Sequence, residues 1–443
     1  MDLQQILDEG NNHYHNKNYI EALRCYTIIL EENPNIIDVW HNKGLTLTHL
    51  ERFDEALEAL EVPIKNNYVE SILTHGSVKR SQGYYREAMM DFGKAFMLNP
   101  THDGAYSNYG NSLREFGIPA LGAYFCQIAQ ELNPDNPTHR LNESVCHLMK
   151  GDLIEGWKKY DGRWFYQSDN SFKPNLPGEE FNGQQDLAGK IVFVYTEQGF
   201  GDAIQFARFI PMLQQRGATV NLYCRKEVER FLKHNLPEVT ITSDTEMEQR
   251  YNYHVPLMDL PKCFGITIHD IPAINYNVGD AEIASWSNIL GNKTKKRIGI
   301  VWSSTRVAWT TRFRNIPLPQ LLSIQNEDIE VVNLAYDVTT EEIDLLESSN
   351  VRVFNSELKD FYSTAGLIKN LDLVITVDTA IVHLAASMNI PTWVMLTDYG
   401  VDWRWFLDRD DSPFYPSVRL FRQKSQGWQT VIDDIKTTLK NNN

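Results

Sequence analysis

The first third of the chain repeats, and this constrains the fold more than any other sequence feature. Glycines recur at spacings of 34, 32 and 34 residues, at Gly10, Gly44, Gly76 and Gly110. A small residue follows each glycine by 12 positions, at Ala22, Ala56, Ala88 and Gly122. A larger apolar or sulfur-bearing residue comes four positions later, at Tyr26, Leu60, Phe92 and Cys126. This period predicts stacked helical hairpins, because one hairpin cannot bury its apolar face alone.

Each part of the pattern has a physical role. A small residue in each of two helices lets their backbones approach closely, and the apolar residue one turn on fills the gap to the next hairpin. A proline then ends the second helix of three units, at Pro34, Pro100 and Pro134. The pattern resembles the tetratricopeptide repeat. This resemblance implies an α-solenoid over residues 1–166, with a partial fifth unit over residues 138–164 as its cap.

The second unit departs from the pattern. Pro63 falls inside its second helix, and Tyr68 stands where the closing proline is expected. A proline inside a helix removes a backbone hydrogen bond. We therefore expect this helix to be kinked or short.

Repeat arrays of this kind expose a concave groove for a peptide or protein segment. We expect the groove to bind a protein partner. The alternative is that the groove is unused and the repeats only rigidify or dimerise the chain.

The remainder of the chain predicts an α/β fold. Residues 167–189 are polar and broken by proline and glycine, which is typical of a linker. Strands are expected at 190–196, 220–224 and 239–242, and a helix at 203–216. A second strand–loop unit begins at Arg297. Strands alternating with helices indicate parallel, Rossmann-like sheets.

The stretch from Leu371 to Leu396 carries the first candidate site. A short apolar strand, 373–377, is followed by two capping residues, Asp378 and Thr379, and by an apolar helix of about ten residues. A helix start at the carboxyl end of a parallel strand suits a phosphate group. His383 lies one turn in and can share that rim. Alternatively, Asp378 is only a cap and His383 is only a core histidine.

Two loops carry the other candidates. The run Glu197–Asp202 follows the first expected strand and contains a Gly-x-Gly pattern, which can also serve simply as a tight strand-to-helix turn. The loop after the strand at 297 carries Arg306, Arg312 and Arg314. This basic loop could equally be solvated and without function.

Two longer runs resemble a known family. Residues 377–386 resemble the nucleotide-diphosphate motif of the heptosyltransferase-like glycosyltransferases of family 9. Residues 197–211 are similar to the first loop of bacterial proteins that fuse tetratricopeptide repeats to such a domain. The resemblance implies a GT-B fold of two Rossmann-like domains. Its acceptor half would span 190–290, and its donor half, with a C-terminal helix, would span 291–443.

The resemblance also implies residue roles. Asp202 would be the general base, within a first loop that includes Gln198, Gly199 and Gly201. The donor's diphosphate and nucleoside would lie against four residues of the second motif: Asp378, Thr379, Ala380 and His383. One of the three loop arginines would supply a cation to the phosphates, and the spacing leaves open which one. The family inverts configuration at the sugar.

The chemistry that this set supports is metal-independent glycosyl transfer. An acceptor hydroxyl needs a base, and a departing diphosphate needs positive charge, which an arginine and a helix start can provide. Asp408 and Asp410 spell an Asp-x-Asp pattern, but they follow no suitable strand, so we interpret them as structural and expect no metal and no cofactor. A competing interpretation of Asp202 is a carboxylate that only stabilises a helix start.

Composition narrows the function classes. The net charge of −16 disfavours nucleic-acid binding. Five scattered cysteines without metal spacing indicate reduced core residues. We find no signal-peptide pattern and no apolar run of about 18 residues, so a cytoplasmic protein without a membrane span is expected. The two hypotheses are a glycosyltransferase whose repeats recruit a protein or glycan acceptor, and a repeat scaffold with an inactive transferase-like domain.

Overall fold

The computed structural model describes residues 2–165, 173–244, 250–304, 313–424 and 427–441. The chain divides into two compact units. The first contains residues 1–150 with 159–163, and the second contains residues 151–158 with 164–443. Among the described residues, no helix combines the length and the apolar character that a membrane span requires.

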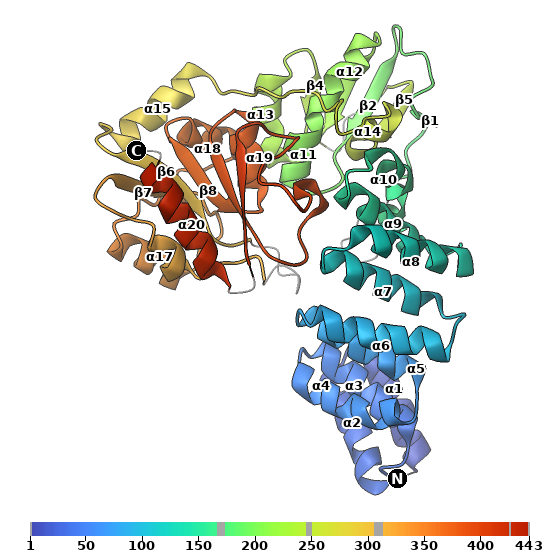
Figure 1. Ribbon diagram of the computed structural model, residues 1–443. Helices are drawn as coiled ribbons and strands as arrows, with labels where there is room; N and C mark the ends of the chain where they lie inside the picture. The colour runs from blue at the N-terminus through green and yellow to red at the C-terminus, as the bar shows by residue number, and fades with distance from the viewer. Residues whose placement is uncertain (1, 166–172, 245–249, 305–312, 425–426, 442–443) are drawn as a thin grey trace. The chain divides into compact units, whose positions relative to one another are not determined.

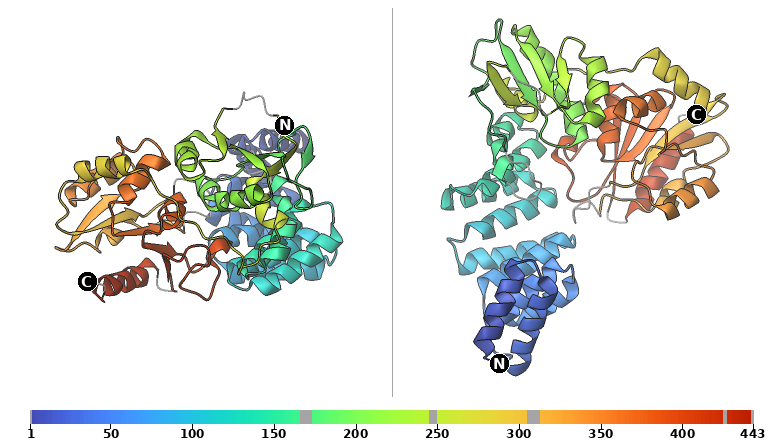
Figure 2. Two further views of the ribbon diagram at one scale, coloured as in Figure 1. Left: turned by 90° about the horizontal axis from the view of Figure 1, so that it is seen from above. Right: turned by 180° about the vertical axis from the view of Figure 1, so that it is seen from behind.

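The first unit is a helical solenoid. Its main helices are 13 or 14 residues long and stack in chain order, as Figure 1 and the right-hand view of Figure 2 show. They are α1 Leu3–His15, α2 Tyr19–Glu32, α3 Ile37–His49, α4 Phe53–Lys65, α5 Val69–Ser81, α6 Tyr85–Leu98, α7 Asp103–Glu115, α8 Pro119–Leu132 and α9 Pro137–Met149. The expected repeat architecture is confirmed.

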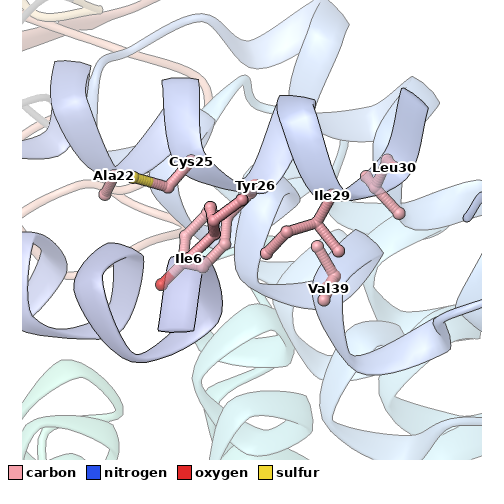
Figure 3. Packing of buried hydrophobic residues seen from close by; sticks show 7 residues of the cluster. All are labelled: Ile6, Ala22, Cys25, Tyr26, Ile29, Leu30 and Val39. Atoms are coloured by element: carbon pink, nitrogen blue, oxygen red, sulfur yellow. The ribbon is translucent and has the colours of Figure 1, made fainter. Parts of the chain in front are cut away.

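The repeated glycines let paired helices touch. A Cβ at Gly10 would lie 2.9 Å from Cβ of Cys25 and 3.0 Å from Cε1 of Tyr26. A Cβ at Gly110 would lie 2.7 Å from the carbonyl oxygen of Gly122. The larger residue of each unit packs on the glycine of its own hairpin, and in the first unit its cluster also reaches Val39 of the next hairpin. Figure 3 shows this cluster, with Tyr26 beside Ile6 of α1 and with Val39 of α3 beside Ile29.

Helix ends follow the prolines as predicted. Helices α2, α6 and α8 each end two residues before a proline. Helix α4 instead runs through Pro63 to Lys65 and is only one residue shorter than these three. Its turn into α5 uses Asn67 in the left-handed region, with φ of 58°. The second repeat thus differs from the other repeats more in the turn between α4 and α5 than in the length of its second helix.

The expected fifth repeat is divided between the two units. Helix α9 belongs to the solenoid, whereas residues 151–158, which contain most of α10 (Leu153–Lys159), belong to the second unit. Trp157 of α10 packs edge-to-face on Phe206 and Trp403, at centroid distances of 5.5 and 5.2 Å. Helix α10 therefore packs with the second unit through Trp157. The six-residue 3₁₀ helix η1, Tyr160–Phe165, follows it.

The second unit contains two five-stranded sheets whose strands all run parallel. The first sheet has the order β1-β5-β2-β3-β4 and the second has the order β10-β9-β8-β6-β7. The strands of the first sheet are β1 Glu179–Glu180, β2 Ile191–Tyr195, β3 Thr219–Tyr223, β4 Thr240–Thr242 and β5 Tyr253–Pro256. Those of the second are β6 Lys296–Val301, β7 Ile329–Asn333, β8 Leu373–Val377, β9 Thr392–Leu396 and β10 Val418–Arg422. The expected α/β class is confirmed.

Helices connect these parallel strands. In the first half they are α11 Phe200–Phe206, η2 Ala207–Phe209, α12 Ile210–Gln215, α13 Lys226–Asn235, η3 Leu257–Asp259 and α14 Leu260–Cys263. In the second half they are α15 Asp280–Leu290, α16 Leu318–Leu322, α17 Thr340–Ser348, α18 Phe361–Ile368, α19 Ala380–Ser387, η4 Trp403–Trp405 and α20 Trp428–Asn441. The expected C-terminal helix is present as α20 and packs against α16 and β10.

Each sheet reverses its strand order once. From β2 the chain adds β3 and β4 on one side and places β5 on the other; from β6 it adds β7 on one side and β8 on the other. Ligands of open α/β sheets bind at such switch points, outside the carboxyl ends of the strands. Helix α11 follows β2, and α19 follows β8, so both begin at a switch point.

Two local expectations were wrong. The segment expected to be a linker, 167–189, contains the edge strand β1 and two buried residues, Phe181 and Leu187, within an otherwise polar sequence. The helix expected at 203–216 begins earlier, at Phe200, and is interrupted by η2. Pro211 lies in the first turn of α12, where its missing N–H is tolerated.

Candidate functional site

The start of α19 has the features of an anion site. Strand β8 is fully buried, and Thr379 occupies the N-cap position after it with an extended backbone. The Thr379 side chain makes no capping hydrogen bond to the first turn of α19. By contrast, Asp360 caps the neighbouring α18 by accepting from the N–H of Ser363 at 2.8 Å. The first-turn N–H groups of α19 therefore lack the N-cap side-chain bond that α18 has, and they suit a ligand anion.

Arg314 reaches this helix start from the loop after β6. Its Nη1 lies 3.5 Å from Oδ2 of Asp378 and donates to the Asp378 carbonyl at 3.2 Å. The N–H of Ser304 donates to Oδ1 of Asn315, which holds the base of the loop together. The structure thus brings Arg314 to the predicted donor site. The other two arginine candidates, Arg306 and Arg312, lie outside the described residues.

The Asp378 carboxylate faces cations and is not a helix cap. Burial raises the pKa of Asp378, and the nearby Asp402 carboxylate adds to this effect, against the lowering charges of Arg314 and Arg404. Thr379 and Ala380 are half-buried beside it, and the Thr379 hydroxyl lies 3.3 Å from that of Thr376. Sequence reasoning therefore placed these residues correctly at one helix start, but assigned Asp378 a capping bond that is not observed.

His383 is enclosed by side chains from three segments. Only 5% of the residue is exposed, and its ring stacks on Trp405 at a centroid distance of 5.8 Å. Its Nδ1 lies 2.9 Å from the Tyr415 hydroxyl. Burial lowers the pKa of His383 to about 3, with the charges of Arg404 and Arg208 contributing. The imidazole is therefore neutral, and it has the contacts that the core-histidine interpretation requires.

Gly201 has a packing role in the first loop. A Cβ at this position would lie 2.5 Å from Cδ2 of His383 and 3.4 Å from Cα of Ala380. Neither Gly201 nor Gly199 has a positive φ, so the tight-turn interpretation does not explain them. The glycine instead lets α11 of one half approach α19 of the other, which Figure 1 shows side by side. Gln198 and Gly199 lie half-buried just before α11.

Asp202 has a bond on each carboxylate oxygen. The N–H of Gly199 donates to its Oδ2 at 2.8 Å, which stabilises the start of α11. Nη2 of Arg404 donates to its Oδ1. The helix-start role considered for Asp202 is therefore present in the structure. Its role as a general base stays a prediction.

Arg404 is the main residue of the site that sequence reasoning missed. Its side chain, 9% exposed, bonds to Asp202 and Asp402, and its Nε donates to Oε1 of Gln205 at 2.8 Å. Trp403 lies under the guanidinium at 4.5 Å from its ring centroid. Burial raises the pKa of Asp402, but the adjacent Arg404 charge and N–H outweigh this and leave it below its usual value. The position of Arg404 between Trp403 and Trp405 was the sequence signal that could have identified it as a buried arginine, since a buried arginine packs well against aromatic rings.

Arg208 is a second buried cation that was not predicted as a site residue. It donates to the carbonyl oxygens of Gln205, Pro272 and Phe414. Its guanidinium lies 4.8 Å from the centroid of the Tyr415 ring. Burial, partly offset by Arg208, raises the pKa of Tyr415 to about 12, so the hydroxyl beside His383 stays protonated.

The predicted absence of a metal site rests on sequence alone. In the part of the chain that the structure describes, no group of three or more His, Cys, Asp or Glu side chains is placed to hold a metal ion. Asp408 and Asp410 are exposed, and Arg409 between them pairs with Asp411. All five cysteines are free thiols.

Comparison with known proteins identifies the repeats. The tetratricopeptide repeat family matches residues 37–61, which cover α3 and most of α4. Protein FlbA of Caulobacter vibrioides is 25% identical over 442 residues, covering 92% of this chain and 73% of that protein. The auxiliary subunit NAA15 of the N-terminal acetyltransferase A complex of Arabidopsis thaliana is 30% identical over 131 residues, 29% of this chain and 14% of that protein.

Solved structures resemble the chain over little more than a third of its length. A thermophilic tetratricopeptide repeat protein from Thermus thermophilus is 20% identical, with a TM-score of 0.33, and covers 38% of this chain and 93% of that one. A tetratricopeptide repeat protein from Parabacteroides merdae is 15% identical, with a TM-score of 0.33, and covers 37% and 72%. The match of residues 37–61 to the repeat family shows that the N-terminal part contains tetratricopeptide repeats, a scaffold class that binds protein partners.

Proposed function

We propose that the chain is a glycosyltransferase of the GT-B type that moves a sugar from a nucleoside-diphosphate sugar to a protein or glycan acceptor. The tetratricopeptide repeats would recruit that acceptor. The reaction would be independent of metal and would invert configuration at the sugar, as the resemblance to family 9 implies. The donor is a substrate, and no further cofactor is needed.

The observation that carries this proposal is the uncapped start of α19 beside Arg314. Two independent features favour an anion there: first-turn N–H groups without an N-cap side-chain bond, and a cation from the loop after β6. Both lie at the switch point between β6 and β8, where α/β sheets bind nucleotides. A departing diphosphate would gain stabilisation from the same groups.

The acceptor side would depend on Asp202. An acceptor hydroxyl is almost fully protonated at neutral pH, so a carboxylate within hydrogen-bond reach accelerates attack on the sugar. Asp202 lies next to Gly201, which contacts α19, so the carboxylate is close to the proposed phosphate site. This proximity supports the role of base.

One observation favours the second candidate, a repeat scaffold with an inactive transferase-like domain. Both oxygens of Asp202 are already bonded, to Gly199 and to Arg404. A carboxylate with both oxygens bonded can serve only to stabilise the start of α11, without any part in catalysis.

A thermal-shift panel of nucleoside diphosphates tests the proposal. A ligand at 100 times its dissociation constant stabilises the folded protein by about 2.7 kcal/mol, which raises the midpoint by about 3–5 °C for a chain of this size. We expect at least one of UDP, GDP, ADP and CDP to do so. Arg314→Gln should reduce the shift, because it removes the cation at the phosphate site.

Arg409→Gln is the matched control, since Arg409 lies in a partly exposed pair with Asp411. The shift should be the same in this variant as in the wild-type protein. No shift with any nucleoside diphosphate would leave the scaffold interpretation in place. Where a nucleoside diphosphate does give a shift, electrospray mass spectrometry of nucleotide-sugar mixtures incubated with the protein identifies the donor by its hydrolysis.

A further inference from the structure

Arg404 joins the two halves of the second unit through a polar network. It belongs to η4 of the second half, yet two of its partners, Asp202 and Gln205, lie on α11 of the first half. Its third partner, Asp402, accepts from Nη1 at 3.1 and 3.2 Å. One guanidinium is thus shared by two carboxylates from different halves.

The Asp202–Arg404 pair lies beside the start of α19. Gly201, next to Asp202, would touch Ala380 and His383 if it carried a Cβ. Trp405, next to Arg404, stacks on His383. The charge of Arg404 also acts on Asp378 and His383, lowering the pKa of both.

The balance of charge among the described ion pairs disfavours a bound diphosphate while the Asp202–Arg404 pair is intact. Among the ion pairs of the described residues, Asp202, Asp378 and Asp402 face only Arg314 and Arg404. A diphosphate adds at least two negative charges in a poorly hydrated setting, where repulsion is strong. A guanidinium binds phosphate at least as well as carboxylate, through the same fork of donors.

We propose that Arg404 is a positioning residue that changes partner. It holds Asp202 in the ion pair seen here, and it transfers to the phosphates of a nucleoside diphosphate that binds at the start of α19. Asp202 then loses its cation, and the carboxylate oxygen that Arg404 occupied becomes free for an acceptor hydroxyl, so that proton acceptance is linked to donor binding. This inference rests on the proposed function and names the residue that would couple its donor site at the start of α19 to its base, Asp202.

The proposal predicts effects of opposite sign in two variants. In Arg404→Gln the phosphates lose a charge-assisted contact, so affinity for nucleoside diphosphate should fall by roughly tenfold or more. In Asp202→Asn the carboxylate no longer competes for Arg404, so affinity should rise, by roughly tenfold. A structural role for Asp202 alone would leave affinity unchanged or weaken it.

Titration calorimetry with UDP, GDP, ADP and CDP on the full chain measures both effects. Asp411→Asn is the control, because it removes a carboxylate from an exposed Asp–Arg pair in the same segment, and its affinity should match that of the wild-type protein. If Arg404→Gln fails to fold, the sign of the Asp202→Asn effect decides alone.

The outcomes are distinct. Tighter binding in Asp202→Asn with weaker binding in Arg404→Gln is the expected result. Unchanged or weaker binding in Asp202→Asn would overturn the exchange while leaving the nucleotide site intact. No binding to the wild-type protein would overturn the proposed function, and the exchange with it.

Discussion

Gly201 shows at the scale of one atom why the two halves of the second unit can meet. A methyl group there would lie 2.5 Å from the His383 ring, closer than real side-chain contacts allow. Gly110 does the same for two solenoid helices, where the obstacle is the Gly122 carbonyl oxygen. Both positions were noticed in the sequence. The periodic spacing explained Gly110, but nothing local indicated what Gly201 would touch 182 positions later.

The buried His383 makes a residue-scale prediction about pH. In the unfolded chain its imidazole takes up a proton near pH 6.5, whereas burial holds the folded pKa at about 3. Lowering the pH therefore favours the unfolded state, and the stability that the neutral ring permits is lost progressively between pH 6.5 and 3. The His383→Gln variant should lack this pH-dependent loss of stability, because glutamine does not titrate. The difference in unfolding free energy between wild type and variant should fall by about 1.4 kcal/mol per pH unit below 6.5.

Urea unfolding at pH 7.5 and 5.5 measures this difference. Glutamine keeps a polar group near the Tyr415 hydroxyl, so the comparison isolates the titration from the loss of the contact. A difference that does not change with pH would mean that His383 titrates normally in the folded protein.

At the scale of elements, periodic and buried segments were the predictable ones. Strand β8 has the bounds read from the sequence, since short apolar runs between turn residues have few alternatives. Strand β1 was not found, because its two residues are glutamates paired to β5 by backbone bonds alone. The Arg404 network also escaped prediction, since it joins segments about 200 residues apart.

The turns of the solenoid give an element-scale prediction. Gly117 lies between α7 and α8 with φ of +94°, and no atom lies within 4 Å of the place that a Cβ would take, so Gly117→Ala tests backbone conformation alone. It should lower stability by about 1 kcal/mol or more. Gly93 lies inside α6, where a Cβ would make only ordinary contacts at 3.8 and 3.9 Å. Gly93→Ala should raise stability by about 0.8–1 kcal/mol.

Urea denaturation followed by circular dichroism compares the two alanine variants with the wild-type protein. Changes of the same sign in both would show that helix propensity and turn conformation do not explain these glycines.

At the scale of the whole molecule, the repeats and the α/β unit carry different parts of the proposal. The family match covers one repeat, and the FlbA alignment, at 92% of the chain, includes most of both units. The repeats supply a scaffold for a partner, while every proposed donor or base residue belongs to the second unit. The division into a repeat scaffold and an α/β unit is thus confirmed, and the assignment of binding to the first and chemistry to the second stays a prediction.

The most direct test of glycosyl transfer is the turnover of the Asp202→Asn variant with the donor identified by mass spectrometry. Asparagine can still accept the Gly199 hydrogen bond, so the helix start should be preserved. If Asp202 is the base, release of nucleoside diphosphate should fall by roughly 10²–10⁴ relative to the wild-type protein. Turnover within about threefold of wild type, in a variant that still binds the donor, would contradict the account.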